Sequence, residues 1–315
     1  MNTDPVKRKL YIIAGPTAVG KSDAGVELAL RVGGEVISAD SMQVYKHMDI
    51  GTAKITKEEM RTVPHHMIDI IEPTEPYHVY DFKNRALKIC KEIYERGKIP
   101  IIVGGTGFYI QALLYDIDFS KSGSDGELRA KLKAIADTGG PEALHEILRE
   151  LDPDTAASLH PNNVKRVIRA IEFARQNDTT IYEHNADQRK KESPFDFKYF
   201  VLNSDRKKVY ERIEKRVDKM IQNGLEDEVR TLVKMGCTPD MTSMQGIGYK
   251  QMLMYLNGEV SMDEAVNLIK RDTRHFAKRQ LTWFNREKDL YWVDKDVYPD
   301  TVSACDYIYD VIKRG

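Results

Sequence analysis

Cysteine is scarce in this sequence: its 315 residues include three, Cys90, Cys237 and Cys305, and these lie far apart. No C-x-x-C pair occurs, so the spacing fits neither a zinc site nor a thiol–disulfide redox motif. Isolated cysteines in an odd number also cannot build the disulfide framework that small secreted domains need. These absences exclude a disulfide-stabilised secreted domain and indicate a reducing compartment.

The sequence also lacks an excess of charge of either sign. Lys and Arg number 48, Asp and Glu number 49, and the formal net charge is −1. Composition therefore gives no sign of a nucleic-acid partner, and a chain like this one must gather its positive charge locally to bind a polyanion. With 41% hydrophobic residues, the chain can nevertheless bury a substantial core.

Long hydrophobic runs are absent as well. The first apolar run, Leu10–Ala14, is broken by Gly15 and Pro16, and it is too short for a signal-peptide core or a membrane span. We therefore expect a cytoplasmic protein with no membrane partner. The sequence contains no internal repeat and no low-complexity tract, which argues against a solenoid or a disordered chain.

Short apolar runs separated by helical patterns indicate an α/β fold. The runs that have the length and composition of buried strands are 9–14, 35–39, 66–71, 99–103, 198–202 and 290–293. Helical patterns occupy 21–32 and 80–96, and Gly97 is placed to end the second of these helices. This alternation predicts a doubly wound parallel sheet.

The stretch 119–195 differs from its surroundings because it contains helical patterns without a convincing strand. Gly140, Pro153 and Pro161 interrupt these patterns. We interpret the stretch as an inserted all-helical domain. It divides the α/β core into a first part at 1–118 and a second part at 196–315, which completes the sheet and adds C-terminal helices.

A phosphate-binding motif follows the first predicted strand: residues 15–22 read GPTAVGKS and match the P-loop pattern G-x-x-x-x-G-K-[ST]. The cradle for phosphate oxygens consists of Gly15, Pro16, Thr17, Ala18, Val19 and Gly20. Lys21 would neutralise the terminal phosphate, the Ser22 hydroxyl would ligate Mg²⁺, and the N-terminus of the next helix attracts anions. The motif thus predicts two adjacent phosphates with Mg²⁺, which ATP and a prenyl diphosphate both supply.

Further motifs distinguish between these two ligands. In chain order they are DSMQVY at 40–45, GTAK at 51–54, GGTGFY at 104–109, LHPNNVKRVIRAIE at 159–172, GIGYKQ at 246–251 and TRHFAKRQLTW at 273–283. With the P-loop, this series closely resembles the tRNA dimethylallyltransferases, also called tRNA isopentenyltransferases. The resemblance covers nearly the whole chain, and it implies a P-loop core that carries a helical insertion.

The resemblance implies an enzyme that transfers a dimethylallyl group from dimethylallyl diphosphate to N6 of the adenosine on the 3′ side of the tRNA anticodon. In the family, residues matching Asp40, Thr106 and Arg216 serve as the general base, as the group that orients the substrate and as a contact of the diphosphate. Asp40 and Thr106 each follow a predicted strand. Because neighbouring parallel strands end at one crevice, we expect both residues to face the P-loop.

Basic segments are candidates for holding the tRNA anticodon stem-loop. On a helical wheel Arg271, Arg274 and Lys278 share one face, and Arg279 follows them. The resemblance implies further tRNA contacts at Asp40, Ser41, Met42, Gln43, Arg129, Lys165, Arg166, Val167, Ile168 and Arg169. It implies no stable protein partner.

Three alternatives to a tRNA prenyltransferase remain. The P-loop alone also fits a small-molecule kinase, in which basic side chains such as Arg166 and Arg169 would clamp the transferred phosphoryl group. An adenylate isopentenyltransferase would share the core but act on free nucleotides. A non-catalytic RNA-binding protein gated by a nucleotide would bind tRNA without modifying it.

Overall fold

The computed structural model describes residues 7–119, 126–177, 179–188 and 191–314. Two compact units make up the chain. The larger unit extends to residue 113 and resumes at 194, and the smaller unit spans 114–193. The helical patterns of the sequence predict bounds of 119–195 for the smaller unit.

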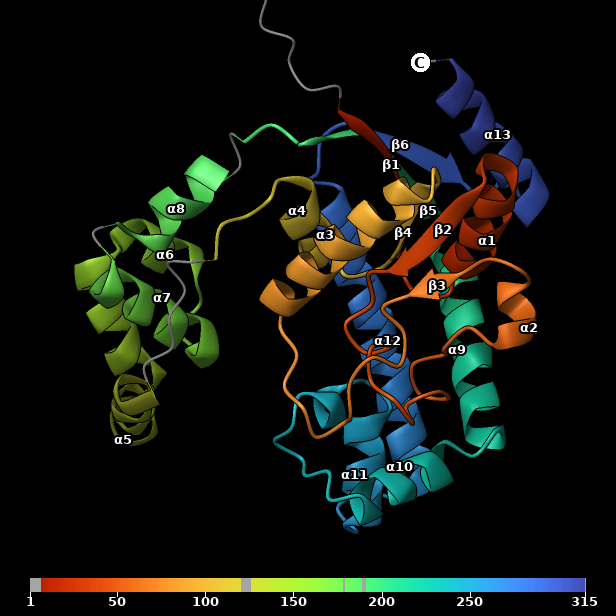
Figure 1. Cartoon of the computed structure of the whole chain (residues 1–315). Helices are drawn as coiled ribbons and strands as arrows, with labels where there is room; N and C mark the ends of the chain where they lie inside the picture. Colours follow the sequence, from red (N-terminus) through yellow and green to blue (C-terminus); the bar gives the residue numbers. More distant parts are fainter. Residues whose placement is uncertain (1–6, 120–125, 178, 189–190, 315) are drawn as a thin grey trace, which may run out of the picture. The chain divides into compact units, whose positions relative to one another are not determined.

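A six-stranded sheet forms the centre of the larger unit (Figure 1). Its strands are β1 (Arg8–Ala14), β2 (Gly34–Ser38), β3 (His65–His66), β4 (Ile99–Gly104), β5 (Phe195–Asn203) and β6 (Leu290–Asp294). They lie in the order β3-β2-β4-β1-β5-β6, and each pairing is parallel. The predicted α/β fold class is confirmed, and the carboxyl ends of β1, β2 and β4 lie side by side at one edge.

The third strand is much shorter than the sequence predicts. The run 66–71 was expected to be extended, but β3 ends at His66. Met67 and Asp69 have φ values of 66° and 53°, in the left-handed region, which an extended strand cannot accommodate. The chain therefore turns after two residues, and Ile71 forms an isolated parallel bridge with Tyr45.

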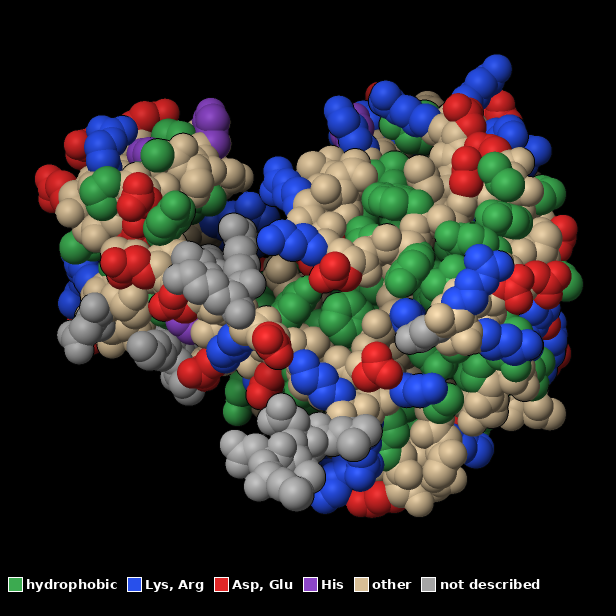
Figure 2. All heavy atoms as spheres, turned by 90° about the horizontal axis from the view of Figure 1, so that it is seen from above, with side chains coloured by type: hydrophobic (Ala, Val, Ile, Leu, Met, Phe, Trp, Pro, Cys, Tyr) green, Lys and Arg blue, Asp and Glu red, His purple; other side chains and the backbone are tan. Residues whose placement is uncertain are grey.

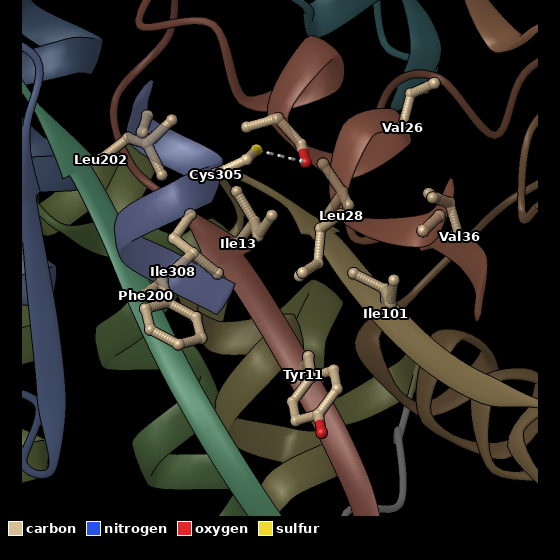
Figure 3. Packing of buried hydrophobic residues seen from close by; sticks show 14 of the residues in the cluster. Tyr11, Ile13, Val26, Leu28, Val36, Ile101, Phe200, Leu202, Cys305 and Ile308 are labelled. Carbon is tan, nitrogen blue, oxygen red and sulfur yellow. Dashed lines mark hydrogen bonds between the residues drawn. The ribbon is translucent and has the colours of Figure 1, made fainter. Parts of the chain in front are cut away.

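One face of the sheet is covered by α1 (Lys21–Val32) and α13 (Thr301–Lys313). Figure 3 shows Ile13 and Phe200 from the sheet beside Leu28 of α1 and Ile308 of α13, and all four side chains are fully buried. Burial of one such side chain stabilises a fold by roughly 1.5–3 kcal/mol. This packing fixes α1, and with it the loop that precedes α1, against the sheet.

The opposite face is covered by α3 (Val79–Glu95) and α4 (Gly107–Leu114) (Figure 1). Phe82 of α3 stacks on Tyr109 of α4 with 4.6 Å between the ring centroids. After α3, Gly97 has a φ of 70°, which agrees with its predicted role in ending that helix.

Further helices complete the larger unit: α2 (Lys57–Met60), α9 (Arg206–Gln222), α10 (Leu225–Lys234), a 3₁₀ turn (Ser243–Gln245), α11 (Tyr249–Leu256) and α12 (Met262–Phe284). Helix α9 buries Val209, Ile213 and Val217, the apolar positions that recur every four residues. It packs along α12. The ring of Phe284, at the end of α12, meets Tyr199 of β5 edge to face at 6.5 Å between centroids.

The smaller unit is built from α5 (Gly126–Leu151), α6 (Pro153–Ser158), α7 (Val164–Gln176) and α8 (Ile181–Gln188), and its described residues contain no strand. Helix α5 is kinked at Gly140, whose φ of 80° and ψ of 167° are not helical, just before Pro141. The hydrophobic core of this unit includes Leu132, Leu144, Leu148, Val167 and Ile171.

On the face drawn in Figure 2, Lys and Arg side chains of the larger unit are interspersed with Asp and Glu side chains, as the near-zero net charge leads one to expect.

Within the described residues, no helix is both long enough and apolar enough to cross a membrane.

Candidate active site

The phosphate loop lies between the end of β1 and the start of α1. A Cβ atom on Gly15, whose φ is 143°, would lie 2.3 Å from the carbonyl oxygen of Leu202, so only glycine fits there. At the other end of the loop Gly20 has a φ of 89°. These glycines let the loop turn directly from the sheet into the N-terminus of α1, where unpaired N–H groups attract anions.

Lys21 lies within this loop rather than in bulk solvent. Its Nζ donates a hydrogen bond to the carbonyl oxygen of Pro16 at 2.7 Å. The pKa of Lys21 is lowered to about 7, chiefly by burial and secondly by the positive charge of Arg216, while the negative charge of Asp40 acts in the opposite direction. The ammonium group is therefore poorly compensated and would gain from a nearby diphosphate.

Arg216 reaches the same loop from α9. One of its terminal nitrogens donates to Thr17 Oγ1 at 3.2 Å. Burial lowers the pKa of Arg216, and the charges of Asp40, Asp23 and Glu59 offset part of this effect. Two partly buried cations thus lie at the phosphate loop, and the negative charge of Asp40 acts on both.

Ser22 is exposed in the first turn of α1, directly after Lys21. A hydroxyl oxygen in this position suits a hard cation such as Mg²⁺, which commonly keeps several waters and takes its other ligands from phosphates. The described residues contain no cluster of three or more His, Cys, Asp or Glu side chains arranged to hold a metal ion. The exposed Ser22 hydroxyl is the group at the loop whose chemistry fits such an ion.

Asp40 follows β2, and its two carboxylate oxygens differ in their surroundings. Oδ1 accepts hydrogen bonds from the backbone N–H groups of Met42, at 2.8 Å, and of Gln43, at 3.3 Å. Oδ2 has no hydrogen-bond donor among the residues that the structure describes. Oδ1 therefore holds the turn, while Oδ2 remains available to accept a proton.

Thr106 lies beside Asp40, as the sequence predicts. Its N–H donates to the Ala39 carbonyl oxygen at 3.2 Å, and its Oγ1 accepts from the Ser41 N–H at 3.3 Å. This approach depends on Gly104, where a Cβ atom would lie 2.3 Å from the Ala39 carbonyl oxygen. Thr106 thus joins the ends of β4 and β2.

Gln280 is a site residue that the sequence analysis missed. Its Oε1 accepts a hydrogen bond from the Thr17 N–H at 2.9 Å, and its Nε2 donates to the Gly105 carbonyl oxygen at 3.0 Å. Gln280 belongs to the buried face of α12, together with Ile269 and Phe284, and it is only 6% exposed. A polar side chain on the buried face of a helix needs partners, and this signal marks Gln280 as a residue with a partner without revealing that the partner is the phosphate loop.

Comparison with known proteins decides the family. A family model described as IPP transferase matches residues 43–287, and one described as isopentenyl transferase matches residues 8–72. A curated tRNA dimethylallyltransferase from Lachnoclostridium phytofermentans is 54% identical over 294 residues, which are 93% of this chain and 94% of that protein. The chain belongs to the tRNA dimethylallyltransferase family.

Solved structures of the family agree. The tRNA isopentenylpyrophosphate transferase of Bacillus halodurans is 43% identical, with a TM-score of 0.73 and 98% of each chain covered. A eukaryotic dimethylallyltransferase, solved acting on tRNA, is 32% identical with a TM-score of 0.78, covering 91% of this chain and 74% of that one.

The stretch 165–168, which the sequence predicts to contact tRNA, has two kinds of side chain. Lys165 and Arg166 are exposed, whereas Val167 and Ile168 are buried in the core of the smaller unit. From this stretch, a side-chain contact with RNA can therefore come from the basic residues but not from Val167 or Ile168.

Arg129 and Arg169 share a buried carboxylate in the same unit. Glu172, fully buried, accepts hydrogen bonds from Nε and a terminal nitrogen of Arg129, at 3.1 and 2.8 Å. A terminal nitrogen of Arg169 lies 4.0 Å from the same carboxylate. The side chain of Arg129 is half exposed, so its remaining N–H groups can reach a ligand.

Helix α12 has the predicted basic face and, opposite it, a buried face. Ile269, Gln280 and Phe284 are buried, whereas Arg271, Lys278 and Arg279 are exposed. Arg271 pairs with Asp272, and Arg274 pairs with Glu214 of α9. The acidic partners reduce the net charge of this stripe.

Proposed function

We propose that the protein transfers a dimethylallyl group from dimethylallyl diphosphate to N6 of the adenosine on the 3′ side of the tRNA anticodon, releasing diphosphate. The observation that carries this proposal is the set of hydrogen bonds by which Gln280 joins Thr17 of the phosphate loop to Gly105, while the adjacent Thr106 holds the Ser41 N–H beside Asp40. The charge of the carboxylate that would accept a proton also acts on both cations, Lys21 and Arg216, that would hold the leaving group.

The leaving group would be bound by the phosphate loop. Lys21, Arg216 and the loop N–H groups would face the two phosphates, and the N-terminus of α1 adds its partial positive charge. When the allylic C–O bond breaks, negative charge accumulates on the diphosphate. Cations that are already held in place stabilise this charge without having to reorganise, which lowers the barrier.

We also propose that Mg²⁺ accompanies the diphosphate. Ser22 is the protein residue that would hold the ion, and its exposed hydroxyl suits this role. When bound, Mg²⁺ would supply further neutralisation of the departing phosphates.

Asp40 would take the proton from the acceptor. The N6 lone pair of adenine is delocalised into the ring and is weakly nucleophilic, and a carboxylate is too weak a base to ionise a neutral amine. We therefore infer that the proton moves to Oδ2 as the C–N bond forms. One C–O bond breaks, one C–N bond forms, the proton goes to Asp40, and the diphosphate leaves.

Binding of the tRNA would use both units of the chain. In the smaller unit Lys165, Arg166, Arg129 and Arg169 are the candidate contacts; in the larger unit Ser41, Met42 and Gln43 would surround the target base. The basic face of α12, formed by Arg271, Arg274, Lys278 and Arg279, would contact phosphates. Because an adenine inside its stack is inaccessible, we infer that the target base is extruded, at a cost of a few kcal/mol.

Nucleoside analysis tests this function. Purified protein, dimethylallyl diphosphate, Mg²⁺ and unmodified tRNA should yield N6-dimethylallyladenosine in the anticodon loop. Modification of free AMP in preference to tRNA would favour an adenylate prenyltransferase, and binding of tRNA without modification would favour a non-catalytic protein. We further propose a cytoplasmic location, where the tRNA substrate occurs.

A further inference from the structure

Glu228, in the first turn of α10, accepts hydrogen bonds from a whole backbone segment. Its Oε2 accepts from the N–H groups of Asp49, at 2.9 Å, and Ile50, at 2.7 Å. Its Oε1 accepts from the Gly51 N–H at 3.0 Å and from the Tyr249 hydroxyl at 2.7 Å. One carboxylate thus holds three consecutive N–H groups that belong to no helix or strand.

The segment that Glu228 holds leads to Gln43. The carbonyl oxygens of the two residues that follow Gly51, Thr52 and Ala53, accept hydrogen bonds from Gln43 Nε2 at 3.3 and 3.4 Å. Gln43 in turn donates its backbone N–H to Asp40 Oδ1 at 3.3 Å. Hydrogen bonds and the backbone between them therefore connect Glu228, through the 49–53 segment and Gln43, to the Asp40 carboxylate.

Tyr249 closes this arrangement from α11. Its ring is 1% exposed and packs so closely on Gly51 that a Cβ atom there would lie 2.6 Å from a ring carbon. Burial and the charge of Glu228 hold the pKa of Tyr249 well above its ordinary value, so the hydroxyl remains a donor. The segment is consequently fixed both by charge and by contact.

From these contacts we infer that Glu228 is a positioning residue for the acceptor base. It fixes the 49–53 segment, this segment fixes the Gln43 amide, and Gln43 with Asp40 receives the adenine. The inference rests on the proposed function. Among the described residues, the hydrogen bonds of Glu228 run to the acceptor side and none reaches the phosphate loop, so loss of Glu228 should affect the use of tRNA more than the binding of dimethylallyl diphosphate.

The variant Glu228→Gln tests this inference. The glutamine retains one oxygen that can accept hydrogen bonds. Its NH₂ group takes the place of the other oxygen, and because it is itself a donor, it cannot accept from the two donors that lie there. Loss of a charge-assisted hydrogen bond lowers an equilibrium or rate constant that depends on it by roughly tenfold or more. We therefore expect kcat/KM for tRNA to fall by at least this factor. The dissociation constant for dimethylallyl diphosphate, measured by titration calorimetry, should stay within about twofold.

Glu226→Gln is the matched control. Glu226 lies in the same helical turn and pairs with Arg230 on the surface, so the change in charge is the same. It should leave kcat/KM for tRNA unchanged. Because wild-type protein is assayed in parallel, failure of the wild type to modify tRNA would refute the proposed function, whereas normal activity of Glu228→Gln would refute only the positioning role.

Two further variants exclude a general loss of folding. Tyr249→Phe removes one of the four donors and should lower kcat/KM for tRNA a few-fold with unchanged donor binding. On a Gln43→Ala background, Glu228→Gln should cause little further loss, because residues that act through one another are not additive. Equal losses for both substrates, or multiplying losses in the double variant, would overturn the inference.

Discussion

The Thr17 N–H of the phosphate loop donates a hydrogen bond to the side chain of Gln280, although 263 positions separate the two residues in the sequence. Through its Nε2, the same amide holds the Gly105 carbonyl oxygen, next to Thr106. One buried side chain therefore joins the proposed binding site of dimethylallyl diphosphate to the proposed binding site of the adenine. A change at Gln280 should disturb both.

The variant Gln280→Leu tests this connection. It leaves the Thr17 N–H and the Gly105 carbonyl without their partner, and each unsatisfied buried group costs about 1–3 kcal/mol. We expect a lower melting temperature and several-fold weaker binding of dimethylallyl diphosphate, measured by calorimetry. Thr282→Val, an exposed position on the same helix, is the control. Unchanged donor binding by Gln280→Leu would show that the loop does not need this contact.

For Asp40 the structure favours asparagine over alanine as the test. The side-chain oxygen of asparagine can still accept hydrogen bonds from the N–H groups of Met42 and Gln43. Alanine would remove these hydrogen bonds together with the proton acceptor. General-base catalysis contributes roughly 10²–10⁴-fold, so Asp40→Asn should lose a comparable factor in single-turnover rate while binding tRNA normally. A variant that retains most of its rate would remove Asp40 from the proton transfer.

The lowered pKa of Lys21, about 7, predicts that donor binding depends on pH. The free protein carries the protonated amine below pH 7 and loses it as pH rises through this value, whereas bound diphosphate favours the protonated form. Affinity should therefore fall above pH 7 by up to about tenfold per pH unit, with proton uptake on binding. Calorimetry in buffers of different ionisation enthalpy measures both.

Lys21→Arg is the control for this pH dependence. Arginine keeps its charge at every pH in this range. Whatever the size of its affinity for dimethylallyl diphosphate relative to the wild type, the variant should bind this donor with nearly constant affinity between pH 7.5 and 9. A wild-type affinity that is equally constant over this range would contradict the assignment.

Glu172 should act on tRNA through Arg129. Glu172→Gln removes the charge that holds two arginine side chains, so tRNA affinity should fall several-fold while donor binding is retained. With Arg129→Ala already present, Glu172→Gln should lower tRNA affinity much less, as a double-mutant cycle would show. Independent effects would indicate that Glu172 serves the core of the smaller unit instead.

The parallel sheet, the phosphate loop and the proximity of Asp40 to Thr106 could be predicted because each follows from a local pattern. The apolar runs predict the strands and, at their ends, the positions of Asp40 and Thr106, and the glycine spacing predicts the phosphate loop. None of these predictions needs knowledge of a distant contact. The third strand was predicted too long because apolar content does not reveal the left-handed conformations of Met67 and Asp69.

Gln280 and Glu228 could not be assigned from local patterns for a related reason. Their partners, Thr17 and the 49–51 segment, are distant in the sequence, and the contacts exist only once α10 and α12 have packed on the core. A buried polar position signals that a partner exists without revealing which one.

The central claim is that the phosphate loop holds a diphosphate whose leaving partner is an allylic carbon. Its most direct test is the stoichiometry of the reaction with purified protein, tRNA, Mg²⁺ and dimethylallyl diphosphate in the absence of ATP. The account predicts one diphosphate released for each prenylated adenosine formed. A requirement for ATP, or its consumption in proportion to product, would contradict it.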